Sequence, residues 1–305
     1  MDPVEPAHAS GAAVSAAWTT LVDVPTLVEA LGREDLRVVD CRFTLSVGGA
    51  DAGAGERAWA AAHIPGAVYA HLERDLSGPM GPGLGRHPWP DAEAFAAALT
   101  RWGIDATTRV VAYDDGDGAF AARLWWLLRC FGHHQVAVLD GGWAQWTATG
   151  APLDVERAAS PPPSIAPVAT PAFDASRLLR DAEALQRHLD AGGVVLDARA
   201  TARFRGEVEP LDPRAGHVPG AINRPYADNL AGGRFKPAAV LTTEFDAALG
   251  GRAPHEVVVM CGSGVTACHH LLAMAHAGLD GARLYAPSWS GWVDDPARPV
   301  ATGAA

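Results

Sequence analysis

Short, uninterrupted apolar runs alternate with longer amphipathic stretches along this chain. Runs of four or five residues without polar alternation are typical of strands buried on both faces of a parallel sheet, and they are RVVD (37–40), RVVAY (109–113), VAVLD (136–140), VVLD (194–197) and EVVVM (256–260). Amphipathic helices are expected between them, for example over 122–132 and 267–278, which end at Gly132 and Gly278. Strands that alternate with helices predict an α/β fold with right-handed crossovers, in which ligands bind at the carboxyl ends of the strands.

This pattern occurs twice. Four segments of the first half recur in the second half in the same order: LRVVDCR as GVVLDAR, AAHIPGAVYAHLERDLSG as AGHVPGAINRPYADNLAG, TTRVVAYDDGDG as PHEVVVMCGSGV, and VLDGGWAQW as LYAPSWSGW. The offset between matched residues drifts only from 157, between Asp40 and Asp197, to 146, between Trp143 and Trp289. Because chance similarity does not preserve order, we predict a duplicated domain.

A proline-rich segment separates the two copies. Residues 152–172 contain six prolines, which favour extended backbone and are excluded from helix interiors. We therefore predict a flexible N-terminal tail over residues 1–16, an N-terminal domain over 17–152, a linker over 153–172 and a C-terminal domain over 173–305.

Composition narrows the range of functions. Hydrophobic residues make up 49% of the chain and charged residues 19%, as in packed globular proteins. The net charge of −11, without a stripe of Lys and Arg, argues against binding to nucleic acid or to an anionic membrane. No apolar run approaches the roughly 18 residues that span a bilayer, and the acidic N-terminus is unlike a signal peptide, so we expect a cytoplasmic location. Four cysteines without a CxxC pair favour free thiols over a disulfide scaffold or a zinc site.

Cys261 carries the clearest chemical signal. An apolar run leads directly into it, and an expected helix follows within a few residues. Backbone amides at the start of a helix bind anions and favour a thiolate, and the loop that offers them consists of Gly262, Ser263, Gly264, Val265, Thr266 and Ala267. The matching position in the first half is Asp114, so the fold does not require a thiol here. We therefore interpret Cys261 as a nucleophile and not as a small core residue.

The motifs HIPGA, HVPGA, CGSGVTAC and SWSGW closely resemble those of the two-domain rhodanese-type sulfurtransferases, over about residues 18–303. The resemblance implies tandem domains, each with a parallel five-stranded sheet flanked by helices, of which the N-terminal one is catalytically silent. It also implies that Cys261 takes a sulfane sulfur from a small anionic donor as a persulfide and passes it to a thiophilic acceptor such as thioredoxin, a glutathione-like thiol or cyanide. The loop amides would hold the outer sulfur, and neither a cofactor nor a metal is implied.

The residues after the cysteine bear on the donor. In this family, members that prefer thiosulfate place Arg and Lys there, whereas members that use 3-mercaptopyruvate have Gly and Ser or Thr. Gly262 and Ser263 therefore favour 3-mercaptopyruvate and leave thiosulfate as the alternative donor. Arg203 matches a family arginine that binds the donor's anionic group. The family's second arginine is replaced here by Asp212, and Arg214 is the candidate substitute.

The resemblance also assigns Ser263 a role in polarising the donor or moving a proton, together with His63 of the HIPGA loop. Asp51 and Glu56 are the candidates for an acid that supports His63. The alternative for His63 is a structural role, in which the imidazole pins its turn, because this copy of the motif lies in the silent half.

Residues with counterparts in both halves are expected to have structural roles. Asp197 is expected to hold the Cys261 loop or Arg199 by hydrogen bonds, and Trp289 to pack behind the loop. The adjacent pairs His133–His134 and His269–His270 do not predict a metal site, because neighbours on a helix point to different faces.

Three other classes of function were weighed. A cysteine phosphatase of the same fold needs an arginine where this chain has Ala267. A nucleotide-binding P-loop needs a lysine that the segment GSGVTA lacks. A non-catalytic sulfur-carrier or regulatory rhodanese module remains an alternative, although Cys261 and its loop are complete.

Overall fold

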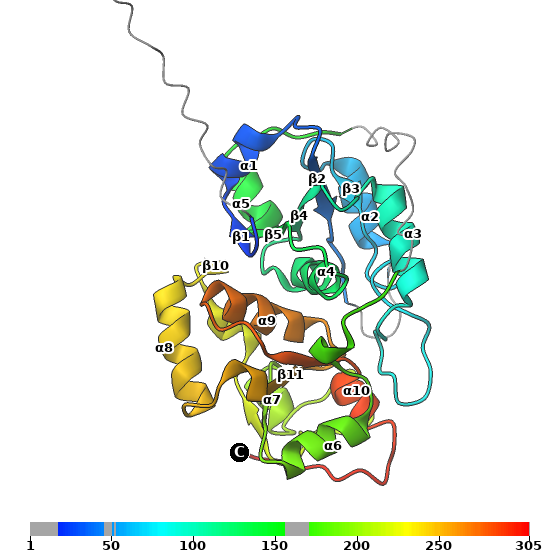
Figure 1. Ribbon diagram of the computed structural model, residues 1–305, viewed down its shortest axis with the longest axis vertical. Helices are drawn as coiled ribbons and strands as arrows, with labels where there is room; N and C mark the ends of the chain where they lie inside the picture. Colours follow the sequence, from blue (N-terminus) through cyan, green and yellow to red (C-terminus); the bar gives the residue numbers. More distant parts are fainter. Residues whose placement is uncertain (1–17, 46–50, 52, 156–170, 305) are drawn as a thin grey trace, which may run out of the picture.

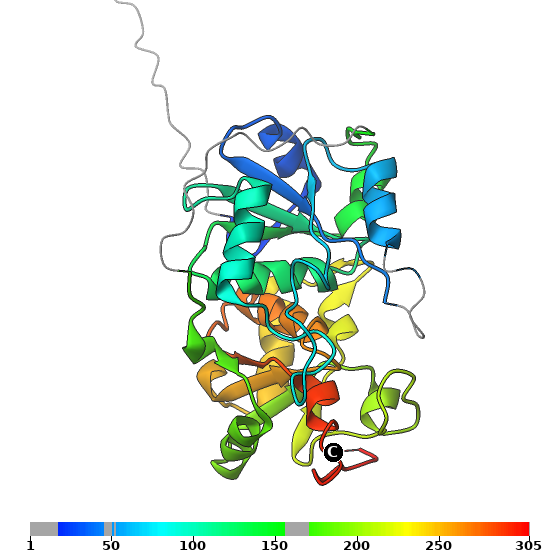
Figure 2. The ribbon, with the colours of Figure 1, turned by 90° about the vertical axis from the view of Figure 1, so that its right-hand side faces the viewer.

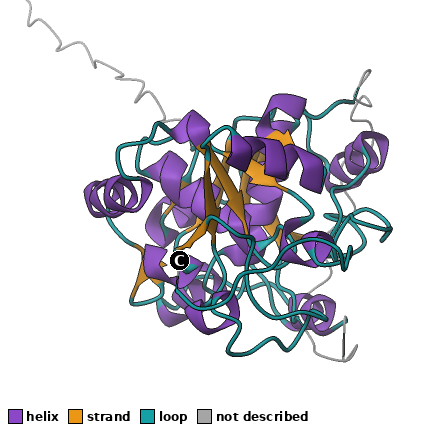
Figure 3. Cartoon of the chain, turned by 90° about the horizontal axis from the view of Figure 1, so that it is seen from below, coloured by secondary structure: helices purple, strands orange, loops and turns teal. Residues whose placement is uncertain are grey.

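The computed structural model describes residues 18–45, 51, 53–155 and 171–304. It shows two α/β domains, one above the other in Figure 1, and the strands of both lie in the interior between helices (Figure 3). The tail expected over residues 1–16 and most of the linker expected over 153–172 lie outside the described residues.

The N-terminal domain contains a five-stranded parallel sheet in the order β1-β5-β4-β2-β3. Its strands are β1 (Leu21–Val22), β2 (Leu36–Asp40), β3 (Val68–Tyr69), β4 (Arg109–Tyr113) and β5 (Val136–Leu139). Its helices are α1 (Val24–Ala30), α2 (Ala54–Ala61), α3 (Ala92–Trp102), α4 (Ala119–Cys130) and α5 (Gly142–Ala148).

The C-terminal domain repeats this topology in a parallel sheet of order β6-β12-β11-β7-β8. Its strands are β6 (Leu178–Leu179), β7 (Val194–Asp197), β8 (Ala221–Asn223), β11 (Val257–Met260) and β12 (Arg283–Tyr285), and β9 (Leu230–Ala231) and β10 (Arg234–Phe235) form a separate hairpin. Its helices are α6 (Ala182–Asp190), α7 (Thr201–Phe204), α8 (Ala238–Leu249), α9 (Thr266–His276) and α10 (Ser288–Trp292).

The tandem α/β fold predicted from the alternating pattern is therefore confirmed. All five apolar runs form strands, and the central ones are buried along nearly their whole length, which explains the absence of polar alternation. Helices α4 and α9 are each followed by a glycine with positive φ, Gly132 at 86° and Gly278 at 79°. Such a conformation ends a helix at little cost only where there is no Cβ.

Helices α4 and α9 pack against each other and join the two domains, as Figure 1 shows at mid-height. One apolar cluster continues across this contact, with Trp125 and Leu128 on the side of α4 and Val265 and Leu271 on the side of α9. The loop that carries Cys261 leads into α9, so the active-site candidate begins at the domain boundary.

Two buried histidines of α9 also lie near this boundary. The Asn229 side-chain amide lies 3.0 Å from Nδ1 of His269 and 2.8 Å from Nδ1 of His270, so both ring nitrogens accept from it. Each Nε2 then donates to a carbonyl oxygen, that of Asp117 at 2.8 Å and that of Arg224 at 2.6 Å. Both imidazoles are thus held neutral by a complete set of partners, in place of a metal site.

Lowering the pH from 6.5 to 5 should destabilise the protein through these two side chains. Burial lowers the pKa of His269 to about 4 and that of His270 well below the ordinary 6.5. The unfolded chain therefore binds more protons than the folded chain in this range. As the pH is lowered, the free energy of unfolding decreases by up to about 1.4 kcal/mol per pH unit for each histidine. Denaturant titrations at pH 6.5 and pH 5 measure how the free energy of unfolding depends on pH. The variant His270→Asn should take up about one proton fewer on unfolding, so its free energy of unfolding should change less between the two pH values. An unchanged slope would show that His270 is not held neutral.

Candidate active site at the domain boundary

Cys261 follows β11 at the carboxyl edge of the second sheet and is only 1% exposed. Its Sγ accepts a hydrogen bond from the amide of Gly264 at 3.2 Å, so the loop places a backbone donor at the sulfur. Gly264 has a φ of 76°, and a Cβ there would lie 2.4 Å from the carbonyl oxygen of Ala286. Only glycine allows this turn, which brings the amide back to the sulfur.

Helix α10 packs against the Cys261 loop and is hydrogen-bonded to it. The amide of Trp289 donates to the carbonyl of Cys261 and that of Ser290 to the carbonyl of Gly262, both at 2.9 Å. The Ser288 hydroxyl accepts from the Cys261 amide at 3.1 Å. Ser288 adopts a φ of 54°, a conformation that costs a non-glycine residue energy and is found where function demands it.

Asp197 and Trp289 support this arrangement through Arg199. The carboxylate of Asp197 accepts from the backbone amide and the guanidinium of Arg199, at 2.7 to 3.1 Å. The guanidinium lies 4.5 Å from the ring of the fully buried Trp289. The first domain repeats the same unit with Asp40, Arg42 and Trp143, which agrees with a structural role.

A histidine of the other domain reaches Ser263. Nδ1 of His87 lies 2.7 Å from the hydroxyl oxygen of Ser263, across the domain boundary. Burial, followed by the charges of Arg123 and Arg86, lowers the pKa of His87 to about 3. The imidazole is therefore neutral at physiological pH and is hydrogen-bonded to the hydroxyl.

His87 is carried by a loop of the N-terminal domain, residues 78–90, which lies beside α10 (Figure 2, where the loop is cyan and α10 is red). The amide of Gly83 donates to Asp294 at 2.6 Å, and that of Arg86 donates to the Ser290 hydroxyl at 3.1 Å. Gly85, with a φ of 79°, approaches so closely that a Cβ would lie 2.4 Å from the carbonyl oxygen of Pro287. This contact fixes the residues that follow against the Cys261 loop.

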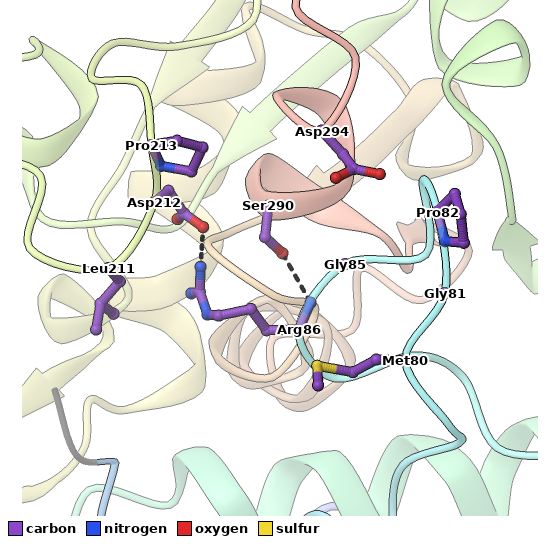
Figure 4. A pocket seen from close by; sticks show the side chains of 10 residues that line it. All are labelled: Met80, Gly81, Pro82, Gly85, Arg86, Leu211, Asp212, Pro213, Ser290 and Asp294. Atoms are coloured by element: carbon purple, nitrogen blue, oxygen red, sulfur yellow. Dashed lines mark hydrogen bonds and ion pairs between the residues drawn. The ribbon is translucent and has the colours of Figure 1, made fainter. Parts of the chain in front are cut away.

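Two arginines and an aspartate lie over Gly262. Arg203 donates to Asp212 at 3.2 Å and to Glu209 at 2.7 Å, and Arg86 forms an ion pair with the same Asp212 from the other domain. A cavity of about 500 Å³ adjoins this group, lined among others by Arg86, Asp212 and Ser290 (Figure 4). Arg86 and Arg203 thus bring guanidinium groups to the residue next to the nucleophile, and Arg86 also borders the cavity.

The structure does not bring His63 to this site, and the predicted partnership with Ser263 is corrected accordingly. His63 is fully buried in its own domain, where Nδ1 bonds to the carbonyl of Trp59 at 2.8 Å and the ring stacks on Trp59. Its counterpart His217 bonds and stacks in the same way on Phe204. The imidazoles of His63 and His217 therefore stabilise the turns that carry them in both copies.

The two acids considered as partners of His63 lie at the surface. Asp51 pairs with Arg57, and Glu56 lies 3.5 Å from Arg74. Neither arrangement points to a catalytic relay.

Arg214 is also placed away from the donor site, contrary to expectation. Its guanidinium donates to the carbonyl oxygens of Pro296 at 3.3 Å and Arg298 at 3.0 Å, so it holds the C-terminal segment. The arginine that the structure does place beside Arg203, over Gly262, is Arg86 from the N-terminal domain.

Arg86 and His87 were not identified from the sequence, because the loop that carries them has no matching segment in the second half of the chain. One signal was available: the offset between the repeats falls from 154, at His63 and His217, to 147, at Asp114 and Cys261. The first half therefore contains seven extra residues in this interval. An insertion in the silent copy is a reason to look there for residues that serve the other copy.

The loop of the N-terminal domain that matches the Cys261 loop contains its own anion. The carboxylate of Asp114 accepts from four backbone amides, those of Gly116, Gly118, Phe120 and Ala121, at 2.9 to 3.1 Å. Burial nevertheless raises the pKa of Asp114 to about 6. The matching loops thus place four backbone amides around a carboxylate in one copy and the amide of Gly264 at a thiol in the other.

Tandem copies of one α/β unit, with a cysteine at the end of the central strand of the second copy, define a class of protein, and comparison with known families agrees. The model of the rhodanese-like domain matches residues 23–149 and 181–295, so the chain belongs to the rhodanese-like family.

Its relatives carry sulfurtransferase names. A Pseudomonas aeruginosa protein named as a probable 3-mercaptopyruvate sulfurtransferase is 49% identical over 93% of this chain and 98% of its own length. A Mycobacterium tuberculosis protein named as the thiosulfate sulfurtransferase SseB is 38% identical over 89% of this chain and 93% of its own. The greater resemblance to the 3-mercaptopyruvate type is thereby confirmed.

A solved structure supports the same placement. The crystal structure of SseA from Escherichia coli, described as a 3-mercaptopyruvate sulfotransferase, is 31% identical and has a TM-score of 0.75. The match covers 89% of this chain and 99% of that one. Across the described ranges, the helices are too short or too polar to cross a membrane.

Proposed function

We propose that this protein is a sulfurtransferase that takes sulfur from 3-mercaptopyruvate through a persulfide on Cys261. The observation that carries the proposal is the Gly264 amide aimed at Cys261 Sγ, at 3.2 Å, in a site where Ser263 is hydrogen-bonded to the neutral His87. The nucleophile, the hydrogen-bonded pair of Ser263 and His87, and two guanidinium groups then lie within one small region. The N-terminal copy, with Asp114 in place of the thiol, is the silent one in this proposal.

In the first half-reaction the Cys261 thiolate attacks the sulfur of 3-mercaptopyruvate. A sulfur–sulfur bond forms and the carbon–sulfur bond breaks, its electron pair going to the carbon as the enolate of pyruvate. The proton of the donor thiol is released and one proton is taken up by the carbon, a transfer that Ser263 and His87 are placed to assist. The loop amides stabilise the charge on the outer sulfur.

In the second half-reaction a thiophilic acceptor attacks the outer sulfur of the persulfide and releases the Cys261 thiolate. A small thiol, cyanide or a thiol protein such as thioredoxin fits this chemistry. A cytoplasmic location, where thiols stay reduced, belongs to the same proposal.

The local charge favours 3-mercaptopyruvate over thiosulfate. Three arginines near the loop, at positions 86, 199 and 203, are matched by the carboxylates of Asp197, Glu209 and Asp212. Arg123, fully buried, donates to the carbonyl of Gly264 and adds one positive charge. Because the arginines at 86, 199 and 203 are already paired with carboxylates, the site suits a monoanionic carboxylate better than a dianion.

The test compares the two donors on the purified protein. We expect kcat/KM for 3-mercaptopyruvate to exceed that for thiosulfate by at least about 10-fold, since the difference of one unbalanced buried charge exceeds about 1.4 kcal/mol. Release of pyruvate and transfer of sulfur to a thiol measure the two half-reactions separately. A preference for thiosulfate would contradict the donor assignment, and activity with neither donor would favour the carrier module.

A further inference from the structure

We propose that Arg86, from the N-terminal domain, is the second donor-binding arginine and closes a clamp with Arg203 on the donor's carboxylate above Gly262. The inference rests on the proposed function, since it names how that site holds its donor. It also gives the domain without the nucleophile a direct part in binding.

The positions of the two guanidinium groups carry the first step. A Cβ on Gly262 would lie 3.1 Å from Nη2 of Arg86 and 3.3 Å from Nη1 of Arg203. The two groups therefore meet over the residue next to the nucleophile, and each comes from a different domain. Among the residues that the structure describes, neither of these two nitrogens donates a hydrogen bond, so both are available to a ligand.

Asp212 holds the clamp in this orientation. One carboxylate oxygen pairs with Nη1 of Arg86 and the other accepts from Nη2 of Arg203 at 3.2 Å. The Asp212 side chain is only 3% exposed, whereas those of Arg86 and Arg203 are 29% and 18% exposed. One carboxylate thus orients both guanidinium groups, and Nη2 of Arg86 and Nη1 of Arg203 are left facing Gly262.

The glycine at 262 is explained by the same geometry. Any side chain at this position would enter the space between the two guanidinium groups, because even a Cβ would lie 3.1 Å from one of them. A larger residue would fill the place that an anion needs. The positive charge over Gly262 is therefore supplied by Arg203 of the same domain and by Arg86 across the domain boundary, and not by the residues that follow the cysteine.

Of the two arginines, Arg86 lines the cavity of about 500 Å³, together with Asp212 and Ser290 (Figure 4). A three-carbon keto acid fits such a space. With its carboxylate bound to two guanidinium groups, its thiol carbon extends toward the loop that carries Cys261. Bidentate pairing with planar guanidinium groups is a strong and directional way to hold a carboxylate.

An exchange of charges across the boundary tests the clamp. Arg86→Asp should raise KM for 3-mercaptopyruvate by at least about 10-fold, because it leaves two carboxylates facing each other and one guanidinium for the donor. The double variant Arg86→Asp/Asp212→Arg returns a guanidinium from the other side and should bring KM back to within about 3-fold of wild type. Arg86→Met, which removes the charge at similar length, should also raise KM for 3-mercaptopyruvate.

A matched control is Arg214→Ala, since Arg214 bonds to carbonyl oxygens of the C-terminal segment and should leave KM unchanged. Thermal unfolding of every variant separates loss of binding from loss of folding. If Arg86→Met folds and keeps the wild-type KM, or if the double variant is no better than Arg86→Asp, the clamp is wrong.

Binding of a donor analogue separates the clamp from the proposed function. 3-Mercaptopropionate has the carboxylate and thiol of the donor but no keto group, and its affinity is measured by calorimetry. If 3-mercaptopropionate binds more weakly to Arg86→Met than to wild type, the clamp is supported, whether or not wild type transfers sulfur from 3-mercaptopyruvate. If wild type transfers no sulfur from 3-mercaptopyruvate, the proposed function is contradicted but the clamp is not. Equal affinity for both proteins would overturn the clamp whatever the enzyme activity.

Discussion

Replacing Cys261 with serine should abolish persulfide formation and lower sulfur transfer by at least about 10⁴-fold, because a hydroxyl cannot form the sulfur–sulfur bond on which both half-reactions depend. The side chain is buried and similar in size, so the fold should be retained. Intact-mass measurement after mixing with 3-mercaptopyruvate should show one added sulfur atom on wild type and none on the variant. Single-turnover release of pyruvate should be lost in parallel.

Cys268 provides the matched control. It lies on the first turn of α9, is fully buried, and its Sγ donates to the carbonyl oxygen of Gly264 at 3.3 Å. Burial raises its pKa to about 12, so this thiol stays protonated and is not a nucleophile. Cys268→Ser should still gain one sulfur atom. Persulfide on the Cys261→Ser protein would instead assign the chemistry to another thiol.

Replacing Arg123 with methionine should destabilise the protein by about 3 to 5 kcal/mol and remove most of its activity. Arg123 is fully buried in α4 and donates to the carbonyls of Leu76, His87 and Pro88 in its own domain, at 3.3 Å, and of Gly264 in the other, at 3.1 Å. It therefore ties the catalytic loop to the segment that carries His87. Methionine fills the space but leaves these carbonyls without a donor.

Denaturant titration and kcat/KM with 3-mercaptopyruvate measure both effects of the Arg123 change. Arg123→Lys keeps the charge but offers fewer donors in a different geometry, so it should be intermediate in stability. Arg33, in the same domain, pairs with Asp35 at the surface and its side chain is 48% exposed, so Arg33→Met is the control that should cost little. An Arg123→Met protein as stable and as active as wild type would show that the four carbonyls do not depend on this side chain.

The fold followed from the sequence because its signals are local and repeated. A run such as EVVVM is buried on both faces wherever it occurs in a parallel sheet, and a glycine such as Gly278 marks the end of a helix by its own backbone preference. The Cys261 loop was predictable for the same reason, since a strand end, two glycines and a helix start lie within a few consecutive residues.

The donor site could not be assembled in this way. Arg86 and His87 meet the Cys261 loop only because residues 78–90 cross to the other domain, a contact between residues more than 170 positions apart. His63 attracted attention through a strong motif, but that motif shapes a turn, as its copy at His217 shows. Sequence similarity to a motif indicates that a residue matters, whereas its neighbours in space decide what it does.

The crossing loop has a consequence for the engineering of this molecule. The amides of Gly83 and Arg86 are bonded to the second domain, and Arg123 is bonded to the carbonyl of Gly264. The copy that has Asp114 in place of the thiol thus supplies part of the surroundings of its partner's nucleophile. A C-terminal domain expressed by itself would present Cys261 without His87 and without the guanidinium of Arg86 near Gly262. The two halves therefore have to be cloned, mutated or exchanged together if the surroundings of the thiol are to be kept.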